Sequence, residues 1–354
     1  MRRGLLQWNP QELPIDVLES RIARLRAAMK RAGLDAFLIY TNFVRPSAVT
    51  YLTGFTPYWS EGMLLVPATG RLVFATALSN RVADWIRSTN PVSEVVSTPT
   101  PGALLGGRLA GDPSVKRVGV LELDMLPSGL ADELAAAAPK VEWVESSAPF
   151  AAFRRQVDDT ERGLLECADA LASAALNQVD TSHASDAGTL AGLLEMHARL
   201  AAAEEVYIAI APDLAASQKF LRVSKPVPLG DRFAVRASVA YKGSWVRRTR
   251  TFASDKSAAT ADAWFKDMMG ALEAGKPLAE QVAARAAALP GAELRSWLAE
   301  NCLGSYPLVA IASSQPKDGS VLADGSFLVL TIELALNGVP WIGAAPCVIG
   351  EPDR

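Results

Sequence analysis

The sequence predicts a chain of two domains, an α/β domain followed by an α+β domain. First, the chain has 354 residues, of which 50% are hydrophobic, and this length favours two hydrophobic cores over one. Second, strand-like and helix-like segments alternate over residues 17–144, whereas strands dominate after residue 204. Third, a linker-like segment, 146–158, separates the two patterns. We therefore expect domains at residues 1–150 and 151–354.

The first domain should contain a largely parallel sheet with helices between its strands. Residues 17–33 form a predicted amphipathic helix, because apolar residues recur at helical spacing up to Gly33, which is suited to end a helix. Thr69-Gly70 marks the turn of a hairpin, and residues 101–113 form a stretch rich in glycine and proline. The other expected elements are strands at 36–40, 61–66, 71–75, 116–121 and 141–144, and helices at 78–87 and 126–138.

The second domain should contain antiparallel strands packed under helices. It opens with a long predicted helix, 159–177, and the segment Gly275-Lys276-Pro277 separates two later helices. The expected helices lie at 159–177, 185–203, 258–274 and 278–288. The expected strands lie at 205–211, 232–241, 246–253, 308–313, 327–336 and 346–349.

Composition and charge exclude several classes of partner. The net charge is −3, from 35 basic and 38 acidic side chains, which gives no reason to expect a nucleic acid or a membrane surface as a partner. Apolar runs are shorter than the ~20 residues of a membrane helix, and residues 1–14 do not have the pattern of a signal peptide. Three widely spaced cysteines form no disulfide framework, so we expect a reducing, cytoplasmic location.

Several short motifs resemble one known family along nearly the whole chain. Tyr51-Leu52-Thr53-Gly54-Phe55 lies in the first domain, and residues 155–161 resemble a linker, with Asp158 where a lysine is usual. Tyr241-Lys242-Gly243 and Arg248-Thr249-Arg250-Thr251-Phe252 lie in the second domain. Together they resemble the creatinase / aminopeptidase P / prolidase family. The resemblance implies a creatinase-like N-terminal domain, a pita-bread C-terminal domain, and a homodimer in which one chain's N-terminal domain covers the other chain's site.

The metal ligands that this resemblance implies are mostly missing. The family holds two divalent cations with two Asp, one His and two Glu, which are hard ligands suited to activating a water. Arg236 and Arg247 stand at the two Asp positions, and residues 232–254 contain no Asp at all. Asn301 stands at the His position, and Glu333 matches the first of the two Glu. The position expected for the second Glu falls in the segment Gly343-Ala344-Ala345-Pro346, which contains no Glu. We therefore expect a degenerate site with no metal and no other cofactor.

Two guanidinium groups in place of two carboxylates predict a cationic pocket for a small anionic molecule. Arg248 and Arg250 share one face of their strand, whereas Arg247 lies on the other face. The candidate binding residues are Arg236, Arg247, Arg250, Lys219, Asn301 and Trp341. The alternative is that Arg236 pairs internally with Glu333.

These observations leave several functions open. One is a metal-independent hydrolase or lyase in which Glu333 is the acid or base, with Tyr241 and Cys302 as further catalytic candidates. Creatinase works without metal through a histidine, but the corresponding segment here, 217–220, contains none. A second is a non-catalytic pseudo-peptidase that serves binding or assembly. A third is an X-Pro dipeptidase or aminopeptidase, which requires a different register for the ligands.

Overall fold

The computed structural model of the chain describes residues 8–57, 61–154, 157–180, 186–223, 225–302, 307–314 and 320–350. The chain divides into two compact units, residues 2–155 and 156–354. The expected boundary at residue 150 falls inside α6 (Ser147–Arg154), and Phe150 of this helix is buried in the core of the first unit. Within the described ranges, no helix is long and apolar enough to cross a bilayer.

The first unit is built on a six-stranded mixed sheet in the order β4-β3-β2-β1-β5-β6. Strand β1 pairs in parallel with β5, while the hairpin of β2 and β3 adds antiparallel pairs to the predicted parallel arrangement. The hairpin is the one expected around Thr69-Gly70, where Gly70 has φ +84°. The strands are β1 (Ala36–Thr41), β2 (Gly62–Pro67), β3 (Leu72–Thr76), β4 (Ser93–Ser97), β5 (Arg117–Leu121) and β6 (Glu142–Glu145).

Helices cover both faces of this sheet and create two separate cores. One core contains Leu18 and Leu25 of α1, and the other contains Leu105 of α4 and Leu134 of α5. Helix α4 lies in the stretch that the sequence analysis described only as rich in glycine and proline. Pro101 is its first residue, a position where proline is compatible with a helix. The helices are α1 (Ile15–Arg31), α2 (Ser47–Thr53), α3 (Asn80–Thr89), α4 (Pro101–Ala110), α5 (Ser128–Ala137) and α6.

The second unit is built on a seven-stranded sheet in the order β11-β10-β12-β13-β9-β8-β7. Its neighbouring strands pair antiparallel, as expected for this half of the chain. Strands β9 and β13 meet at one residue pair, Thr249 with Ala344, so the two halves of the sheet join at this point. The strands are β7 (Glu205–Ala211), β8 (Arg232–Tyr241), β9 (Ser244–Ala253), β10 (Ala292–Asn301), β11 (Val309–Ser313), β12 (Phe327–Leu336) and β13 (Val339–Val348).

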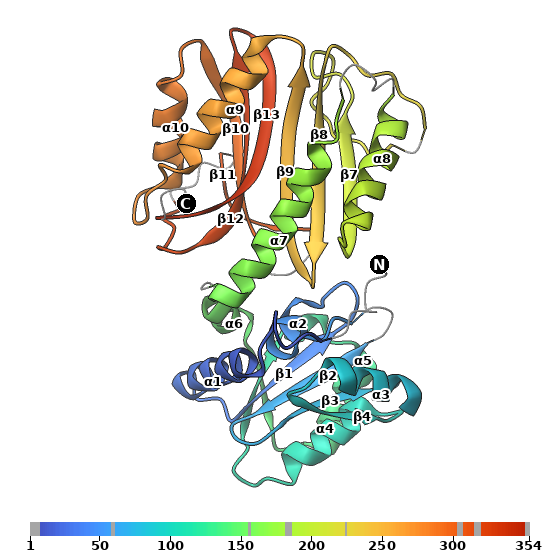
Figure 1. Ribbon diagram of the computed structural model, residues 1–354. Helices are drawn as coiled ribbons and strands as arrows, with labels where there is room; N and C mark the ends of the chain where they lie inside the picture. The colour runs from blue at the N-terminus through green and yellow to red at the C-terminus, as the bar shows by residue number, and fades with distance from the viewer. Residues whose placement is uncertain are drawn as a thin grey trace. The chain divides into compact units, whose positions relative to one another are not determined.

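Four helices pack on one face of this sheet (Figure 1). On β8, Val235 and Ala237 belong to the core formed with α7 and α8. On β12, Leu330 and Ile332 belong to the core formed with α9 and α10. Because side chains alternate along a strand, the residues between them point to the opposite face. The helices are α7 (Asp159–Leu176), α8 (Ala187–Leu200), α9 (Lys256–Met269) and α10 (Leu278–Ala287).

A tight turn fixes the register of the β8–β9 hairpin. Lys242 and Gly243 both have positive φ, 47° and 80°, as a two-residue hairpin loop requires. Tyr241 therefore faces Ser244, and the ladder continues from this pair along both strands. A second loop of the same kind, Asn337-Gly338 with φ 52° and 80°, joins β12 to β13. These turns determine which side chains share a face of the sheet.

Candidate functional site

The face of the seven-stranded sheet opposite α7–α10 carries a row of polar side chains, and we call it the helix-free face. Arg236 lies opposite Thr249 in the β8–β9 ladder, and Ser238 lies opposite Arg247. Directly opposed residues of an antiparallel pair point to the same side, so all four lie on this face. On β12, Thr331 and Glu333 alternate with the helix-facing Leu330 and Ile332, which places them on the same face. Strand pairing therefore brings Arg236, Arg247 and Glu333 to one surface.

Arg236 is held by contacts with β9 and with the segment before β8. Its Nε donates to Thr249 Oγ1 at 3.4 Å, and its guanidinium carbon lies 3.9 Å from the centre of the Phe220 ring. Phe220 itself packs against a small cluster that includes Ala234 and Ile342. The side chain is half-buried, so its charge lies at the boundary between protein and solvent. The planar guanidinium stacks its face on the aromatic ring in this arrangement.

Arg247 forms an ion pair with Glu300 that is buried at both ends. Arg247 is 8% exposed and Glu300 is 5% exposed, and Arg247 Nη1 bonds to Glu300 Oε2. Arg247 Nε also donates to Ser238 Oγ at 3.4 Å. Strands β13 and β12 lie between the strands that carry the two residues. The pair therefore links the two halves of the sheet across the helix-free face, and the charge of Arg247 is matched within the protein.

Glu333 and Thr331 lie on β12 with different hydrogen-bonding states. Glu333 Oε2 accepts a hydrogen bond of 2.7 Å from Ser296 Oγ, so its partner is Ser296 and not Arg236 as in the alternative interpretation. A register shift between Leu294 and Ser296 aligns Ser296 with Glu333. Thr331 is 6% exposed, and within the described residues its Oγ1 has no hydrogen-bond partner. A buried hydroxyl in this state costs free energy unless something else bonds to it.

Two predicted binding residues lie on the helix-covered face instead. Trp341 is 1% exposed, donates from Nε1 to Asp262 Oδ1 at 2.9 Å, and packs against Phe265. Arg250 points toward α9, with Nε 3.5 Å from Asp262 Oδ2. Burial raises the pKa of the Asp262 carboxyl, and the Trp341 and Arg250 contacts oppose that rise. Strand alternation explains why both side chains point to the helices. Trp341 is three residues from Ala344 and Arg250 is one residue from Thr249, and an odd spacing along a strand places side chains on opposite faces.

Two predicted catalytic residues also lie apart from Glu333. Tyr241 lies two residues after Val239 and therefore shares with it the helix-covered face of β8. Burial raises the pKa of the Tyr241 hydroxyl. Cys302 is 1% exposed at the end of β10, and burial raises the pKa of its thiol well above the usual value. A buried, protonated thiol is a poor nucleophile. Glu333 lies on the helix-free face, whereas Tyr241 lies on the helix-covered face.

The remaining candidates lie at the margins of the site. Lys219 is exposed and precedes Phe220, and its backbone amide donates to Ser217 Oγ at 3.2 Å. Asn301 is half-buried at the last position of β10, and its Oδ1 is a buried atom with no partner among the described residues. Residues 303–306, which follow Cys302, lie outside the described residues.

Sequence reasoning missed three residues that shape this face: Glu300, Ser296 and Thr331. The alternation of polar residues with Leu330 and Ile332 on β12 was a usable signal for Thr331. Glu300 had no local signal, because its pairing with Arg247 depends on how β10 reaches the far half of the sheet.

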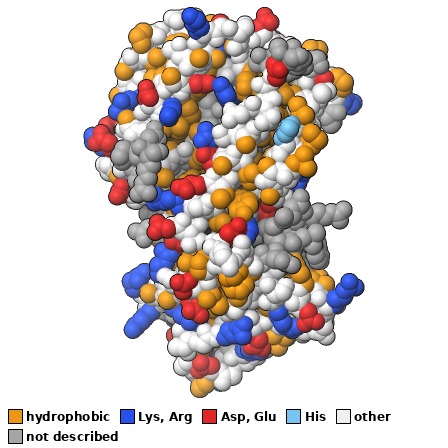
Figure 2. All heavy atoms as spheres, in the orientation of Figure 1, with side chains coloured by type: hydrophobic (Ala, Val, Ile, Leu, Met, Phe, Trp, Pro, Cys, Tyr) orange, Lys and Arg blue, Asp and Glu red, His pale blue; other side chains and the backbone are white. Residues whose placement is uncertain are grey.

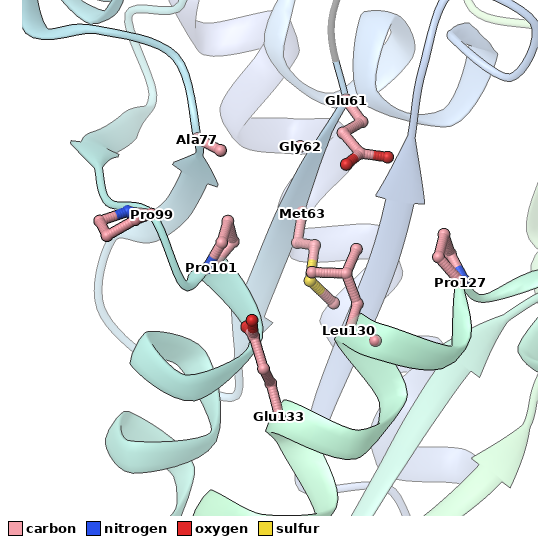
Figure 3. A pocket seen from close by; sticks show the side chains of 10 residues that line it. Glu61, Gly62, Met63, Ala77, Pro99, Pro101, Pro127, Leu130 and Glu133 are labelled. Carbon is pink, nitrogen blue, oxygen red and sulfur yellow. The ribbon is translucent and has the colours of Figure 1, made fainter.

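Described cavities lie in the first unit. A cavity of about 260 Å³ opens at the ends of β2 and β3, with Glu61 and Glu133 at its two ends and Met63 and Leu130 between them (Figure 3). Both carboxylates are engaged: Glu61 accepts from Tyr40 at 2.7 Å, and Glu133 accepts from the backbone amide of Ala103 at 3.1 Å. A second cavity of about 840 Å³ lies between α1 and α4. Acidic and basic side chains are interspersed over the visible surface (Figure 2).

Comparison with known proteins decides the fold. Residues 21–156 match the family model described as the Creatinase/Prolidase N-terminal domain. The whole chain superposes on an X-Pro aminopeptidase of Thermotoga maritima with a TM-score of 0.70 and 16% identity, covering 94% of this chain and 95% of that one. This is the creatinase/prolidase fold.

Two further solved structures share the creatinase/prolidase fold with this chain. An Xaa-Pro dipeptidase of Bacillus anthracis is 20% identical with a TM-score of 0.70, covering 94% of this chain and 95% of that chain. The prolidase of Pyrococcus horikoshii is 15% identical with a TM-score of 0.68, covering 94% of this chain and 96% of that chain. No curated protein is significantly similar in sequence. The family resemblance and the two-domain fold class predicted from the sequence are thereby confirmed.

Potential metal ligands do not cluster in the described part of the chain. No three His, Cys, Asp or Glu side chains lie close enough together there to hold a metal ion. On the helix-free face, Glu300 bonds to Arg247 and Glu333 bonds to Ser296, and strands β12 and β10 place them on different rungs of the ladder.

Proposed function

We propose that the second unit binds a small anionic molecule on its helix-free face through Arg236, and that any reaction there proceeds without metal. The observation that carries this is the position of Arg236, stacked on Phe220 and bonded to Thr249 at the rim of a buried polar row. A guanidinium oriented in this way suits a carboxylate or a phosphate. The pair of Arg247 and Glu300 positions the neighbouring strands.

The side chains on this face do not fit a pair of divalent cations. Arg236 and Arg247 stand where the family resemblance places two carboxylate ligands, and an arginine stays protonated and cannot act as a ligand. The carboxylate of Glu300 already neutralises Arg247. We therefore derive no step through a metal and treat Glu333 as the group that would exchange a proton with a bound molecule.

A thermal-shift series tests anion binding at Arg236. Acetate, phosphate and glycyl-proline are added in turn to the wild type, to Arg236→Ala and to Arg250→Ala. We expect at least one probe to stabilise the wild type and Arg250→Ala but not Arg236→Ala, because Arg250 lies on the helix-covered face. Equal shifts in all three proteins, or no shift in any, would remove the support for this pocket.

Peptidase activity is the alternative that the structural relatives support, since they include an X-Pro aminopeptidase, an Xaa-Pro dipeptidase and a prolidase. Metal analysis of the purified protein, followed by glycyl-proline hydrolysis with added manganese, separates the two functions. We expect neither stoichiometric metal nor hydrolysis. Hydrolysis that depends on bound metal would establish a peptidase and refute metal independence.

A binding protein without turnover is a second candidate. The observation that favours it is the position of Tyr241 on the helix-covered face, together with the burial of Cys302 at the end of β10. Anion binding with no change in the bound probe over prolonged incubation would support this candidate.

A further inference from the structure

One cavity of the first unit has a carboxylate at each end and apolar side chains between them (Figure 3). It is the cavity of about 260 Å³ at the ends of β2 and β3, and α4 and α5 line it through Pro101 and Leu130. All of its lining residues belong to the first unit. Since a water molecule takes roughly 30 Å³ in the liquid, this space admits a molecule of several non-hydrogen atoms.

Close packing of α4 and α5 holds Glu133 at one end of the cavity. Gly102 permits this approach, because a Cβ there would lie 2.7 Å from the Leu130 carbonyl oxygen and 2.8 Å from the Glu133 Cβ. The Oε2 of Glu133 accepts from the backbone amide of Ala103 at 3.1 Å, in the first turn of α4. The carboxylate is therefore half-buried and held in one orientation.

Glu61 is held at the other end by a contact with β1. Its Oε2 accepts from the Tyr40 hydroxyl at 2.7 Å, and the side-chain amide of Asn42 donates to that hydroxyl at 3.3 Å. Glu61 is exposed, so solvent reaches this end of the cavity. The contacts of Glu61 and Glu133 each use Oε2, and among the described residues the Oε1 of each accepts no hydrogen bond.

The charge of the two carboxylates is not balanced inside the cavity. None of its described lining residues is a lysine or an arginine. Neither Glu61 nor Glu133 forms an ion pair within the part of the chain that the structure describes. Arg45, whose charge acts on Tyr40, forms its ion pair with Glu122 instead, at 2.9 Å. A molecule that complements this cavity should carry a positive charge at each end and hydrocarbon between them.

We infer that this cavity binds a short aliphatic diamine, with one ammonium group on Glu133, the other on Glu61, and its carbon chain against Met63 and Leu130. Each ammonium group would donate a charge-assisted hydrogen bond to a carboxylate. A monoamine would compensate one carboxylate only, and an anion would meet two like charges. The inference concerns the first unit and does not depend on the anion site proposed for the second.

Calorimetric titration with aliphatic amines tests the diamine site. The probes are diamines of three to six carbons and n-butylamine, and the proteins are the wild type, Glu61→Gln, Glu133→Gln and Asp132→Asn. We expect the best diamine to bind the wild type about fivefold more tightly than n-butylamine, as one additional ion pair outside the core provides. Glu61→Gln and Glu133→Gln should each reduce this preference to the small statistical advantage of a molecule with two equivalent ends.

Asp132→Asn is the matched control, because Asp132 is exposed, precedes Glu133 on α5 and does not line the cavity. This variant should bind the diamines as the wild type does. Glu133→Gln keeps an oxygen that can accept from the Ala103 amide, and Glu61→Gln keeps one for Tyr40. Thermal transitions like that of the wild type would show that a lost preference is not lost folding.

Two kinds of result would overturn the inference. The first is a wild type that binds no diamine, or that binds diamines and n-butylamine equally. The second is an equal loss of diamine affinity in Asp132→Asn, which would show that amines respond to the net negative charge of the protein and not to this cavity.

Discussion

Arg247 and Glu300 form a buried ion pair although two strands, β13 and β12, lie between the strands that carry them. The pair therefore connects the two halves of the sheet, which also meet at the ladder pair of Thr249 and Ala344 and through the bonds of Thr251 to Ile342. Breaking a buried pair by removing one partner leaves a charge without compensation in a medium that solvates it poorly.

Stability should depend on Arg247 and Glu300 together. We expect Arg247→Met and Glu300→Leu each to lower the free energy of unfolding by about 3–5 kcal/mol, and the double variant to lose clearly less than their sum. Urea unfolding measures this. The exposed helical pair of Arg199 and Glu195, with side chains 36% and 44% exposed, is the control, and Glu195→Gln should cost less than about 1 kcal/mol. Additive losses at 247 and 300 would show that the pair is not coupled.

Thr331→Val should stabilise the protein in the absence of any ligand. The change removes a buried, unpaired hydroxyl and keeps the branched shape, so we expect a gain of about 1–2 kcal/mol. Thr251→Val is the matched control, since it removes hydrogen bonds of 2.9 and 3.0 Å to the carbonyl and amide of Ile342 and should cost at least about 1 kcal/mol. Chemical denaturation of both variants measures these changes in the free energy of unfolding. A loss of stability in Thr331→Val would mean that the Thr331 hydroxyl has a partner within the protein.

Acid should weaken the start of α9 through Asp255. Hydrogen bonds from Ser257, followed by the contact with Arg232, lower the pKa of this carboxyl to about 2 from its usual 3.8. A depressed folded-state pKa gives stability that is full above the unfolded value and is lost as pH falls through the folded one, so the loss should occur between about pH 4 and pH 2.

Asp255→Asn keeps the helix cap and removes the charge. We expect its stability to match the wild type at pH 2 and to fall short of it by less than about 1 kcal/mol at neutral pH, because the carboxylate is 55% exposed and screened by solvent. Unfolding curves across this pH range measure the difference. A gap that grows as the pH falls would have the wrong sign for this mechanism.

Cysteine alkylation should distinguish Cys167 from Cys302. Cys167 is exposed, whereas Cys302 is buried with its thiol pKa raised well above the usual value. We expect iodoacetamide to modify Cys167 in the native protein and Cys302 only after unfolding, as read by peptide mass spectrometry. Rapid native modification of Cys302 would restore it as a candidate nucleophile.

Much of the fold followed from local patterns. The helices around 159–177 and 185–203 correspond to α7 and α8, and the paired strands around Lys242-Gly243 follow from turn chemistry. Helix α4 was missed because glycine and proline obscured the apolar spacing of Leu105 and Leu109. Local patterns predict an element well where apolar residues recur at regular spacing, and poorly where a helix begins with proline and contains glycine.

The site was harder to predict than the fold. Alternation along β8 and β9 placed Arg247 away from Arg248 and Arg250 correctly, because it depends only on neighbours in the chain. Trp341 was proposed as a binding residue from its nearness in sequence, whereas alternation along β13 puts it among α9 side chains. Glu300 depends on the order of strands from β9 to β10, which no local pattern contains.

The ion pair of Arg247 and Glu300 also constrains how this sequence can evolve. A single substitution that places a carboxylate at 247 would bring two acids together in a buried position, and a single loss of Glu300 would leave the guanidinium without its counter-charge. Either intermediate should be disfavoured by selection, so the two positions are expected to co-vary among close relatives. A change of charge at either position therefore requires a two-step path through a less stable protein.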